Sequence, residues 1–195
     1  MSSLRHAVKR LVQGIALVLM CPLALLTAFG RLGPVYSFFA QALALSPGMP
    51  GSYLRAAYYK LTLRKCSIDV TIWFGTYVVD PATSLGELVS IGSYCVVGRS
   101  SIGPRTQIGS HVLIPSGRQQ HVRSEDGTLS GCVSGETLIG ADCWIGDAAV
   151  VMAELGDGVT VGAGAVVTKP VAARTTVVGN PARPIQQMST ANQVG

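Results

Sequence analysis

Residues 139–185 read IGADCWIGDAAVVMAELGDGVTVGAGAVVTKPVAARTTVVGNPARPI, and this stretch decides the fold. A branched or long apolar residue precedes glycine at Ile139, Ile145, Leu155 and Val161, and the apolar positions recur every six residues, from 139 to 151 and again from 155 to 167. Six residues match neither the period of an α-helix nor that of a strand. The period predicts a coil with flat faces, in which the apolar residue points inward and the glycine tolerates the backbone angles of a corner.

A second inward position follows four residues later and must be small, because the interior of such a coil is narrow. Cys143, Ala149, Val159 and Ala165 occupy it. An earlier block continues the period, and Trp73 and Tyr77 are expected to close its first turn because they are large. The predicted inward residues of this block are Trp73, Val79, Leu85, Ile91 and Val97, with Tyr77, Thr83, Val89, Cys95 and Ser101 between them, and then, after a slip of one residue, Ile102, Thr106, Ile108, Val112 and Ile114.

These repeats resemble those of the hexapeptide acyltransferases, which fold as a left-handed parallel β-helix. The closing segments VGAGAVVTKPV and GNPARPI are similar to the acetyl-CoA-binding end of the branch that contains sugar O-acetyltransferases. The resemblance covers roughly residues 68–186. It implies a mainly β fold of about four to five stacked turns, a homotrimer with active sites between subunits, acetyl-CoA as co-substrate, and no metal.

The period stops after Ile114 and resumes at Ile139, and the polar loop 115–137 separates the two blocks. The resemblance places a catalytic histidine in such a loop, and the match here is His121 in SGRQQHV. An imidazole can accept the proton of a sugar hydroxyl as the oxygen attacks a thioester. A backbone N–H of a coil corner would stabilise the oxyanion. The group that orients the ring stays open, with four candidates: Glu125, Asp126, Asp80 and Glu87.

The resemblance also assigns residues that bind acetyl-CoA. Asp147 and Ala163 would contact its pantetheine arm through backbone atoms, while Thr168, Lys169 and Arg183 match the family's TK and NPAR segments. Lys169 and Arg183 would pair with phosphate, since cationic donors form strong hydrogen bonds to it. Two further features of the sequence bear on the shape of the groove that would hold acetyl-CoA. Trp144 is expected to face outward, where it would either wall the donor tunnel or make a subunit contact, and the short spacing from Val151 to Leu155 predicts a tight corner in the donor groove.

Other site chemistries are less well supported. Only three histidines occur, with His6 in the basic amino-terminal arm and His111 on an outward position of the coil. Some proteins of this fold are zinc carbonic anhydrases, but a zinc site needs about three protein ligands within reach. The five cysteines form no CxxC pair, which indicates buried thiols in a reducing compartment.

The amino-terminal segment is strongly apolar. Residues 11–30 are long enough to span a bilayer, and a shorter apolar stretch follows at 32–45. Basic residues flank both ends of this region, which favours both flanks on the cytoplasmic side. A re-entrant hairpin or a helix in one leaflet is therefore expected, with a signal peptide or a two-pass hairpin as the alternatives. The net charge of +5 is compatible with binding to an anionic membrane surface or an anionic cofactor. The sequence has no basic run interleaved with aromatic residues, so it does not indicate binding to nucleic acid.

The sequence predicts four segments. They are an apolar helical membrane anchor at 1–50, a capping amphipathic helix at 51–66, the β-helix domain at 67–186 and a tail at 187–195. A Pro/Gly linker is expected at 46–52, and Arg55 and Lys60 are expected to face outward from a helix at 53–63.

The predicted function is acetyl transfer from acetyl-CoA to a sugar hydroxyl. The anchor favours a lipid-linked precursor of an exopolysaccharide or capsule as the acceptor, at the cytoplasmic face of a bacterial inner membrane. The alternatives are an acyltransferase for a soluble acceptor (an amino acid, an antibiotic or an amino sugar) and a non-catalytic β-helix scaffold.

Overall fold

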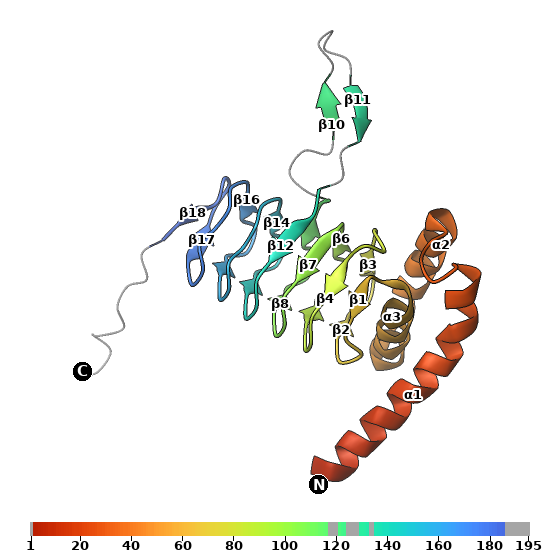
Figure 1. Ribbon diagram of the computed structural model, residues 1–195. Coiled ribbons are helices and arrows are strands. Elements are labelled where there is room, and N and C mark those ends of the chain that lie inside the picture. The colour runs from red at the N-terminus through yellow and green to blue at the C-terminus, as the bar shows by residue number, and fades with distance from the viewer. Residues whose placement is uncertain (1, 117–120, 124–128, 133–134, 186–195) are drawn as a thin grey trace.

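The computed structural model describes residues 2–116, 121–123, 129–132 and 135–185, with side chains described for 4–116 and 135–185. Short strands coil into a solenoid, and three helices cover the end at which the coil begins (Figure 1). The carboxy-terminal end of the coil lies at the opposite end of the molecule. The predicted tail at 187–195 lies outside the described residues.

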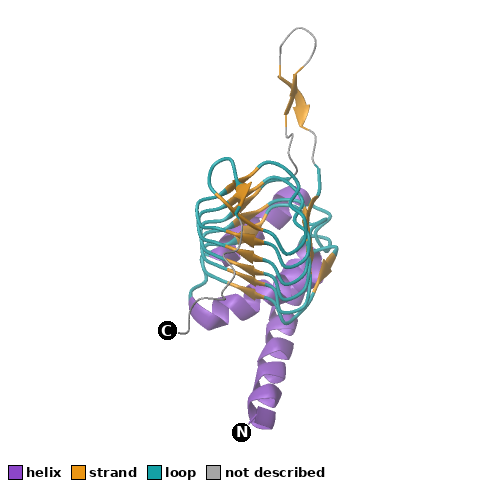
Figure 2. Ribbon diagram, turned by 90° about the vertical axis from the view of Figure 1, so that its left-hand side faces the viewer, coloured by secondary structure: helices purple, strands orange, loops and turns teal. Residues whose placement is uncertain are grey.

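The coil has three parallel faces, and Figure 2 looks along it. The first face stacks β1 (Lys65–Cys66), β4 (Ser84–Leu85), β7 (Ser100–Ile102) and β12 (Thr137–Ile139). The second stacks β2 (Thr71–Ile72), β5 (Ser90–Ile91), β8 (Gln107–Ile108), β13 (Trp144–Ile145), β15 (Thr160–Val161) and β17 (Thr176–Val178), with β18 (Arg183–Pro184) added antiparallel to β17. The third stacks β3 (Tyr77–Val78), β6 (Val96–Val97), β9 (Leu113–Ile114), β14 (Val150–Val151) and β16 (Val166–Val167).

The hexad positions of the second block form the interior as predicted. Ile145 pairs with Val161 in parallel register, and both are fully buried. The small residues that were expected at the second inward position are buried as well: Cys143, Ala149, Val159 and Ala165. The β-solenoid fold is therefore confirmed, and its apolar interior is continuous from turn to turn.

The predicted frame of the first turn is wrong by one residue. Ile72 and Val78 are buried, whereas Trp73 and Val79 are 40% and 43% exposed. Thr76 and not Tyr77 takes the smaller inward position, so neither aromatic residue closes the turn.

The cause of this shift is a wider corner. The Asp80 carboxylate accepts a hydrogen bond from the Ala82 N–H at 2.8 Å, and the Thr83 N–H donates to the Asp80 carbonyl at 3.1 Å. Because of this turn the inward position Leu85 comes seven residues after the inward position Val78, so counting back from Leu85 in steps of six misses Val78 by one residue. At β7 the spacing between the inward positions Val97 and Ile102 is five, one residue shorter than a hexad, and Ser100 and not Ser101 is buried there.

The predicted loop 115–137 leaves the coil between β9 and β12. It contains an antiparallel hairpin of β10 (His121–Arg123) and β11 (Leu129–Cys132), with an irregular register between His121 and Val122. The hairpin projects away from the side of the coil (Figure 1). No period in the sequence indicated these two strands.

The amino-terminal segment forms α1 (Ser2–Leu26), α2 (Gly33–Ala44) and α3 (Gly48–Thr62). α3 begins inside the stretch that was expected to be a linker, because Pro47 takes the N-cap position and a proline is tolerated in the first helical turn. Within the described part of the chain, only residues 4–26 form a helix long and apolar enough to cross a membrane.

The prediction that Arg55 faces outward is wrong. Its side chain is fully buried, and it donates hydrogen bonds to the carbonyls of Leu43 at 2.9 Å, Ser46 at 2.7 Å and Ile72 at 3.0 Å. The last carbonyls of a helix have no partner within the helix and carry partial negative charge. Arg55 therefore joins the end of α2 to the first turn of the coil, and burial lowers the pKa of its guanidinium.

Tyrosines hold the helices against the coil. The Tyr36 hydroxyl donates to the Val78 carbonyl at 3.0 Å, and the Val78 N–H donates to the Tyr59 hydroxyl at 3.0 Å. Tyr58 stacks on Tyr36 and donates to its carbonyl. The helices and the coil thus share one hydrophobic core.

Candidate functional site

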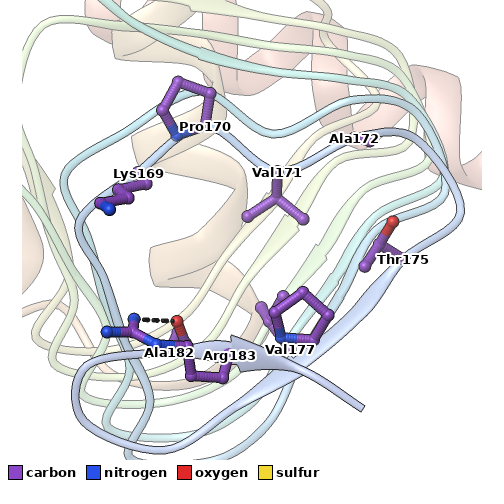
Figure 3. A pocket seen from close by; sticks show the side chains of 9 residues that line it. Lys169, Pro170, Val171, Ala172, Thr175, Val177, Ala182 and Arg183 are labelled. Atoms are coloured by element: carbon purple, nitrogen blue, oxygen red, sulfur yellow. Dashed lines mark hydrogen bonds between the residues drawn. The ribbon is translucent and has the colours of Figure 1, made fainter. Parts of the chain in front are cut away.

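Lys169 and Arg183 line one pocket of about 420 Å³ at the carboxy-terminal end of the coil. Lys169 follows the last strand of the third face, and Arg183 belongs to β18, which turns back along β17. Figure 3 shows both cationic side chains on the same side of the pocket. The floor carries apolar residues of the last turn, among them Val171 and Val177.

The pocket suits an anion with an apolar extension. Its nine lining residues include two cations and no carboxylate: Lys169, Pro170, Val171, Ala172, Thr175, Val177, Ala182, Arg183 and Pro184. The guanidinium of Arg183 is held near its own backbone by a 2.9 Å hydrogen bond to the Ala182 carbonyl. Ammonium and guanidinium groups on one wall can bind phosphate oxygens from two directions.

The other residues predicted to bind acetyl-CoA do not line this pocket. Thr168 precedes Lys169 and is half-buried. Asp147 and Ala163 lie on successive turns of a different corner, between the second and third faces, where the Gly164 N–H donates to the Asp147 carbonyl at 2.8 Å. The structure therefore brings Lys169 and Arg183 together and places Asp147 and Ala163 elsewhere on the coil.

The Asp147 carboxylate has a structural partner. It accepts a hydrogen bond from the Ser110 N–H of the preceding turn at 2.6 Å. A side chain at Gly146 would meet the backbone nitrogen of Ala163 at 2.6 Å, so only glycine allows the turns to stack this closely. Asp147 and Ala163 are both exposed at this corner.

His111 lies on the same corner column and is exposed, as predicted. Its ring stacks on Tyr94 with centroids 5.3 Å apart, and Tyr94 meets Phe74 edge to face at 5.5 Å. Trp144 also faces outward and is 59% exposed. The aromatic ladder of Phe74, Tyr94 and His111 was not expected, because its members come from separate turns.

A second pocket, of about 290 Å³, lies at the root of the hairpin. Glu136, Met152, Glu154 and Pro170 are among its lining residues, and Pro170 also lines the first pocket. Glu136 forms an ion pair with Arg64, which follows α3. The two pockets therefore adjoin along one corner of the coil, with cations at one end and carboxylates near the hairpin.

The predicted catalytic histidine sits on this hairpin. The backbone of His121 belongs to β10 and pairs with Cys132, while its side chain lies outside the described residues. Two of the groups proposed to orient it, Glu125 and Asp126, also lie outside them. Asp80 is engaged by its own corner, as described above, and Glu87 lies on another corner, where its carbonyl accepts from the Arg105 N–H at 2.8 Å.

Metal ligands and reactive thiols do not gather among the described side chains. In residues 4–116 and 135–185, no group of three His, Cys, Asp or Glu residues is close enough to hold a metal ion. Cys66, Cys95 and Cys143 are buried free thiols. Burial raises the pKa of Cys66 to about 12, which disfavours the nucleophilic thiolate.

Comparison with models of protein families found no match. The chain is 45% identical over 56 residues to a chloramphenicol acetyltransferase from Agrobacterium fabrum, covering 28% of this chain and 27% of that protein. It is 38% identical over 63 residues to a chloramphenicol acetyltransferase from Escherichia coli, covering 31% and 30%. The chain thus matches less than a third of the length of these curated relatives.

Solved structures resemble the chain over more of its length. A maltose O-acetyltransferase from Clostridium difficile 630 has a TM-score of 0.63 at 21% identity, covering 79% of this chain and 85% of that one. A hexapeptide-repeat-containing acetyltransferase from Vibrio cholerae has a TM-score of 0.57 at 17% identity, covering 83% and 93%. An N-acyltransferase from Bacillus cereus, solved with dTDP-4-amino-4,6-dideoxyglucose and coenzyme A, has a TM-score of 0.51 at 18% identity, covering 60% and 68%. The predicted resemblance is confirmed at the level of the fold.

Proposed function

We propose that this chain, which has the fold of the hexapeptide-repeat acetyltransferases, moves an acetyl group from acetyl-CoA to a sugar hydroxyl. The observation that carries the proposal is the pocket in which Lys169 and Arg183 face one cavity without a carboxylate beside them. Such a pocket fits the phosphates of coenzyme A. Asp147 and Ala163 would contact the pantetheine arm along the neighbouring corner.

His121 would act as the general base. It takes the proton of the acceptor hydroxyl while the hydroxyl oxygen attacks the thioester carbonyl carbon. A C–O bond forms, the C–S bond breaks, and the leaving thiolate recovers the proton from the imidazolium. A backbone N–H at a coil corner would stabilise the oxyanion, and no acyl-enzyme is required.

The acceptor we propose is a saccharide held at a membrane, such as a lipid-linked precursor of an exopolysaccharide or capsule at the cytoplasmic face of the inner membrane. The apolar helix α1 supports this location, since a soluble acceptor would give no reason for it. The partial identity with chloramphenicol acetyltransferases favours a soluble acceptor as the second candidate. A screen of acceptors in the presence of acetyl-CoA would discriminate between the two.

Binding of acetyl-CoA tests the proposal. A ligand at about 100 times its dissociation constant adds about 2.7 kcal/mol to the folded state, which raises Tm by roughly 5–10 °C in a chain of this size. We expect this shift for the wild type in detergent and expect it to fade in the Lys169→Ala/Arg183→Ala variant. Differential scanning calorimetry or fluorimetry measures it.

The matched control removes two cations elsewhere. Lys60 and Arg174 are exposed and lie outside this pocket, so Lys60→Ala/Arg174→Ala should keep the full shift. An equal shift in wild type and both variants would refute the assignment of the pocket. No shift at millimolar acetyl-CoA would refute acetyl-CoA as the donor.

We also propose that the third face forms the contacts of a homotrimer. Its outward side chains lie in register and are all apolar: Tyr77, Val96, Leu113, Val150 and Val166. The outward residues of the second face are mostly hydroxyl or amide side chains: Thr71, Ser90, Gln107, Trp144, Thr160 and Thr176. An apolar row of side chains is therefore available at every turn to contact the neighbouring copies around a three-fold axis.

Leu113→Asp should convert the trimer into monomers, because it places a charge at the centre of this ladder. Gln107→Asp adds the same group at a strand of the polar face and should leave the trimer intact. Light scattering after size exclusion in detergent gives the mass of the protein part. A trimer that survives Leu113→Asp but not Gln107→Asp would place the contact on the second face instead.

A further inference from the structure

α1 has one face that packs on the rest of the protein. Gln13, Ala16, Met20 and Ala24 are buried on this face. The Gln13 amide donates to the Ile68 carbonyl at 3.0 Å and to the Asp69 carboxylate at 3.2 Å. These hydrogen bonds attach the helix to the first turn of the coil, and α1 also packs on α3.

Asp69 strengthens this attachment with two ion pairs. Its carboxylate lies 2.8 Å from the Lys9 ammonium and 3.3 Å from the Arg10 guanidinium. The hydrogen bond from Lys9, followed by that from Gln13, keeps the pKa of Asp69 below its ordinary value. α1 thus carries polar groups whose partners belong to the body of the protein.

The opposite face of α1 is apolar and exposed. Leu4, Val8, Leu11, Ile15, Val18 and Leu25 recur there at alternating spacings of four and three residues, with Pro22 completing the series. Leu4 and Val18 are 72% and 74% exposed. Leu19 and Leu26 widen the stripe, and exposed apolar residues continue past the helix at Phe29 and Leu32. α1 lies at the edge of the molecule beside α3 (Figure 1), and these side chains remain exposed there.

The charge around this face has one sign. Residues 1–68 contain eight Lys and Arg and no Asp or Glu, whereas all ten acidic residues of the chain lie at Asp69 or beyond. A segment of this kind is attracted to anionic lipids, because each basic residue near a membrane surface adds to the binding. Two copies of the segment would repel each other.

We propose that α1 lies in the plane of an anionic membrane surface, with its outward face in the boundary between headgroups and acyl chains and its inward face docked on the coil. The inference rests on the membrane association proposed above and specifies the orientation of α1 relative to the bilayer. An interfacial helix exposes an apolar face to lipid, and α1 exposes one while Gln13, Lys9 and Arg10 bond to the body of the protein. A helix crossing the bilayer would withdraw Gln13, Lys9 and Arg10 from Ile68 and Asp69 and leave their polar groups in hydrocarbon, where each unsatisfied group is costly.

Vesicle binding tests the face. The variant Leu11→Glu/Val18→Glu should bind vesicles of phosphatidylcholine with 30% phosphatidylglycerol about 100-fold more weakly than the wild type, since two apolar side chains no longer enter the membrane. The matched control Val79→Glu/Leu88→Glu alters exposed apolar residues of the coil and should bind like the wild type. Vesicles of phosphatidylcholine alone should bind the wild type at least tenfold more weakly. Equal binding by both variants would overturn the proposal.

Depth measurements separate a helix in the plane from one that crosses. From Leu4 to Leu25 an α-helix rises about 31 Å, close to the thickness of the hydrocarbon core, so a crossing helix would spread these positions over the whole bilayer. Single cysteines are introduced by Leu4→Cys, Leu11→Cys, Val18→Cys or Leu25→Cys in a background with Cys21→Ser and Cys132→Ser. Each is labelled with a fluorophore and quenched by lipids that carry a quencher at known depths.

Equal, shallow depths at all four positions are the expected result. Depths greatest at Leu11 and Val18 and least at Leu4 and Leu25 would show a crossing helix and overturn the proposal. Labels that no lipid quenches, together with disulfide cross-linking through Val18→Cys, would assign the face to a second copy and also overturn it.

The change in Tm on adding acetyl-CoA distinguishes a failure of this inference from a failure of the proposed reaction. Leu11→Glu/Val18→Glu should retain the shift, because it leaves the Lys169 and Arg183 pocket unchanged. Loss of vesicle binding with the shift retained supports the membrane face whatever the acceptor is. Absence of the shift in the wild type would refute the donor without affecting the vesicle result.

Discussion

Replacing His121 by alanine is expected to lower kcat for acetyl transfer by about 100- to 10,000-fold, the contribution of a well-placed general base. The acceptor hydroxyl would then attack the thioester with no group to take its proton. The thermal shift with acetyl-CoA should persist, because His121 lies on the projecting hairpin and the Lys169–Arg183 pocket lies at the end of the coil. Release of free thiol from acetyl-CoA in the presence of the acceptor measures the rate.

His111 provides the matched control for this variant. It is the other histidine of the coil region, it is exposed, and its contact is a stack on Tyr94. His111→Ala should keep kcat close to that of the wild type. The wild-type rate should rise with pH, because a general base acts only in its unprotonated form, and this rise should disappear in His121→Ala. Full activity of His121→Ala would assign the base to another residue.

Replacing Arg55 by alanine is expected to lower the free energy of unfolding by about 3–5 kcal/mol, the largest effect on stability that we expect from a single substitution here. The change removes two buried hydrogen bonds and one partly buried hydrogen bond to carbonyls, and it leaves a cavity between α2, α3 and the coil. In a chain of this size the corresponding loss of Tm is roughly 6–20 °C. Thermal unfolding in detergent, followed by circular dichroism, measures it.

Two further variants identify the cause. Arg55→Lys keeps the charge but cannot reach all three carbonyls in one planar fork, so it should fall between wild type and alanine. Arg105→Ala removes an exposed guanidinium that pairs with Asp142 at 2.6 Å and should barely change Tm. Equal Tm values for Arg55→Ala and Arg105→Ala would mean that the buried arginine does not join the helices to the coil.

The coil could be predicted from the sequence because its period is local. Each hexad carries its own apolar residue and its own glycine, so the register from Ile139 to Val167 follows from the chain itself. The prediction failed where a corner gains a residue, as at Asp80, since counting by six does not detect a wider turn. It failed at Arg55 for a different reason, because the carbonyls that hold the guanidinium belong to elements separate from α3.

The individual residues of the candidate site could be predicted from the sequence, but the pockets in which they meet could not. Lys169 and Arg183 were each assigned to phosphate from a short motif, and they share a pocket because β18 folds back along β17. The pocket that contains Glu136 and Glu154 was missed, since the hairpin that separates Glu136 from the preceding turn follows no period. The role of His121 remains a prediction.

The number of turns in the coil determines how far the hairpin and the Lys169–Arg183 pocket lie from the end of the coil that the helices cover. Neighbouring strands of one face are about 4.8 Å apart, so the hairpin, which leaves after the third strand of the third face, emerges about 10 Å beyond the first strand of that face. The second face continues to its sixth strand, about 24 Å from its first, where the Lys169–Arg183 pocket opens. With α1 in the membrane plane, as proposed above, the coil would extend from the bilayer and hold the Lys169–Arg183 pocket at a set distance from the lipid. If the proposed reaction takes place there, we expect the coil to select acceptors by how far their hydroxyl lies from the lipid, and inserting or deleting one turn should move the reaction by the length of about one sugar ring.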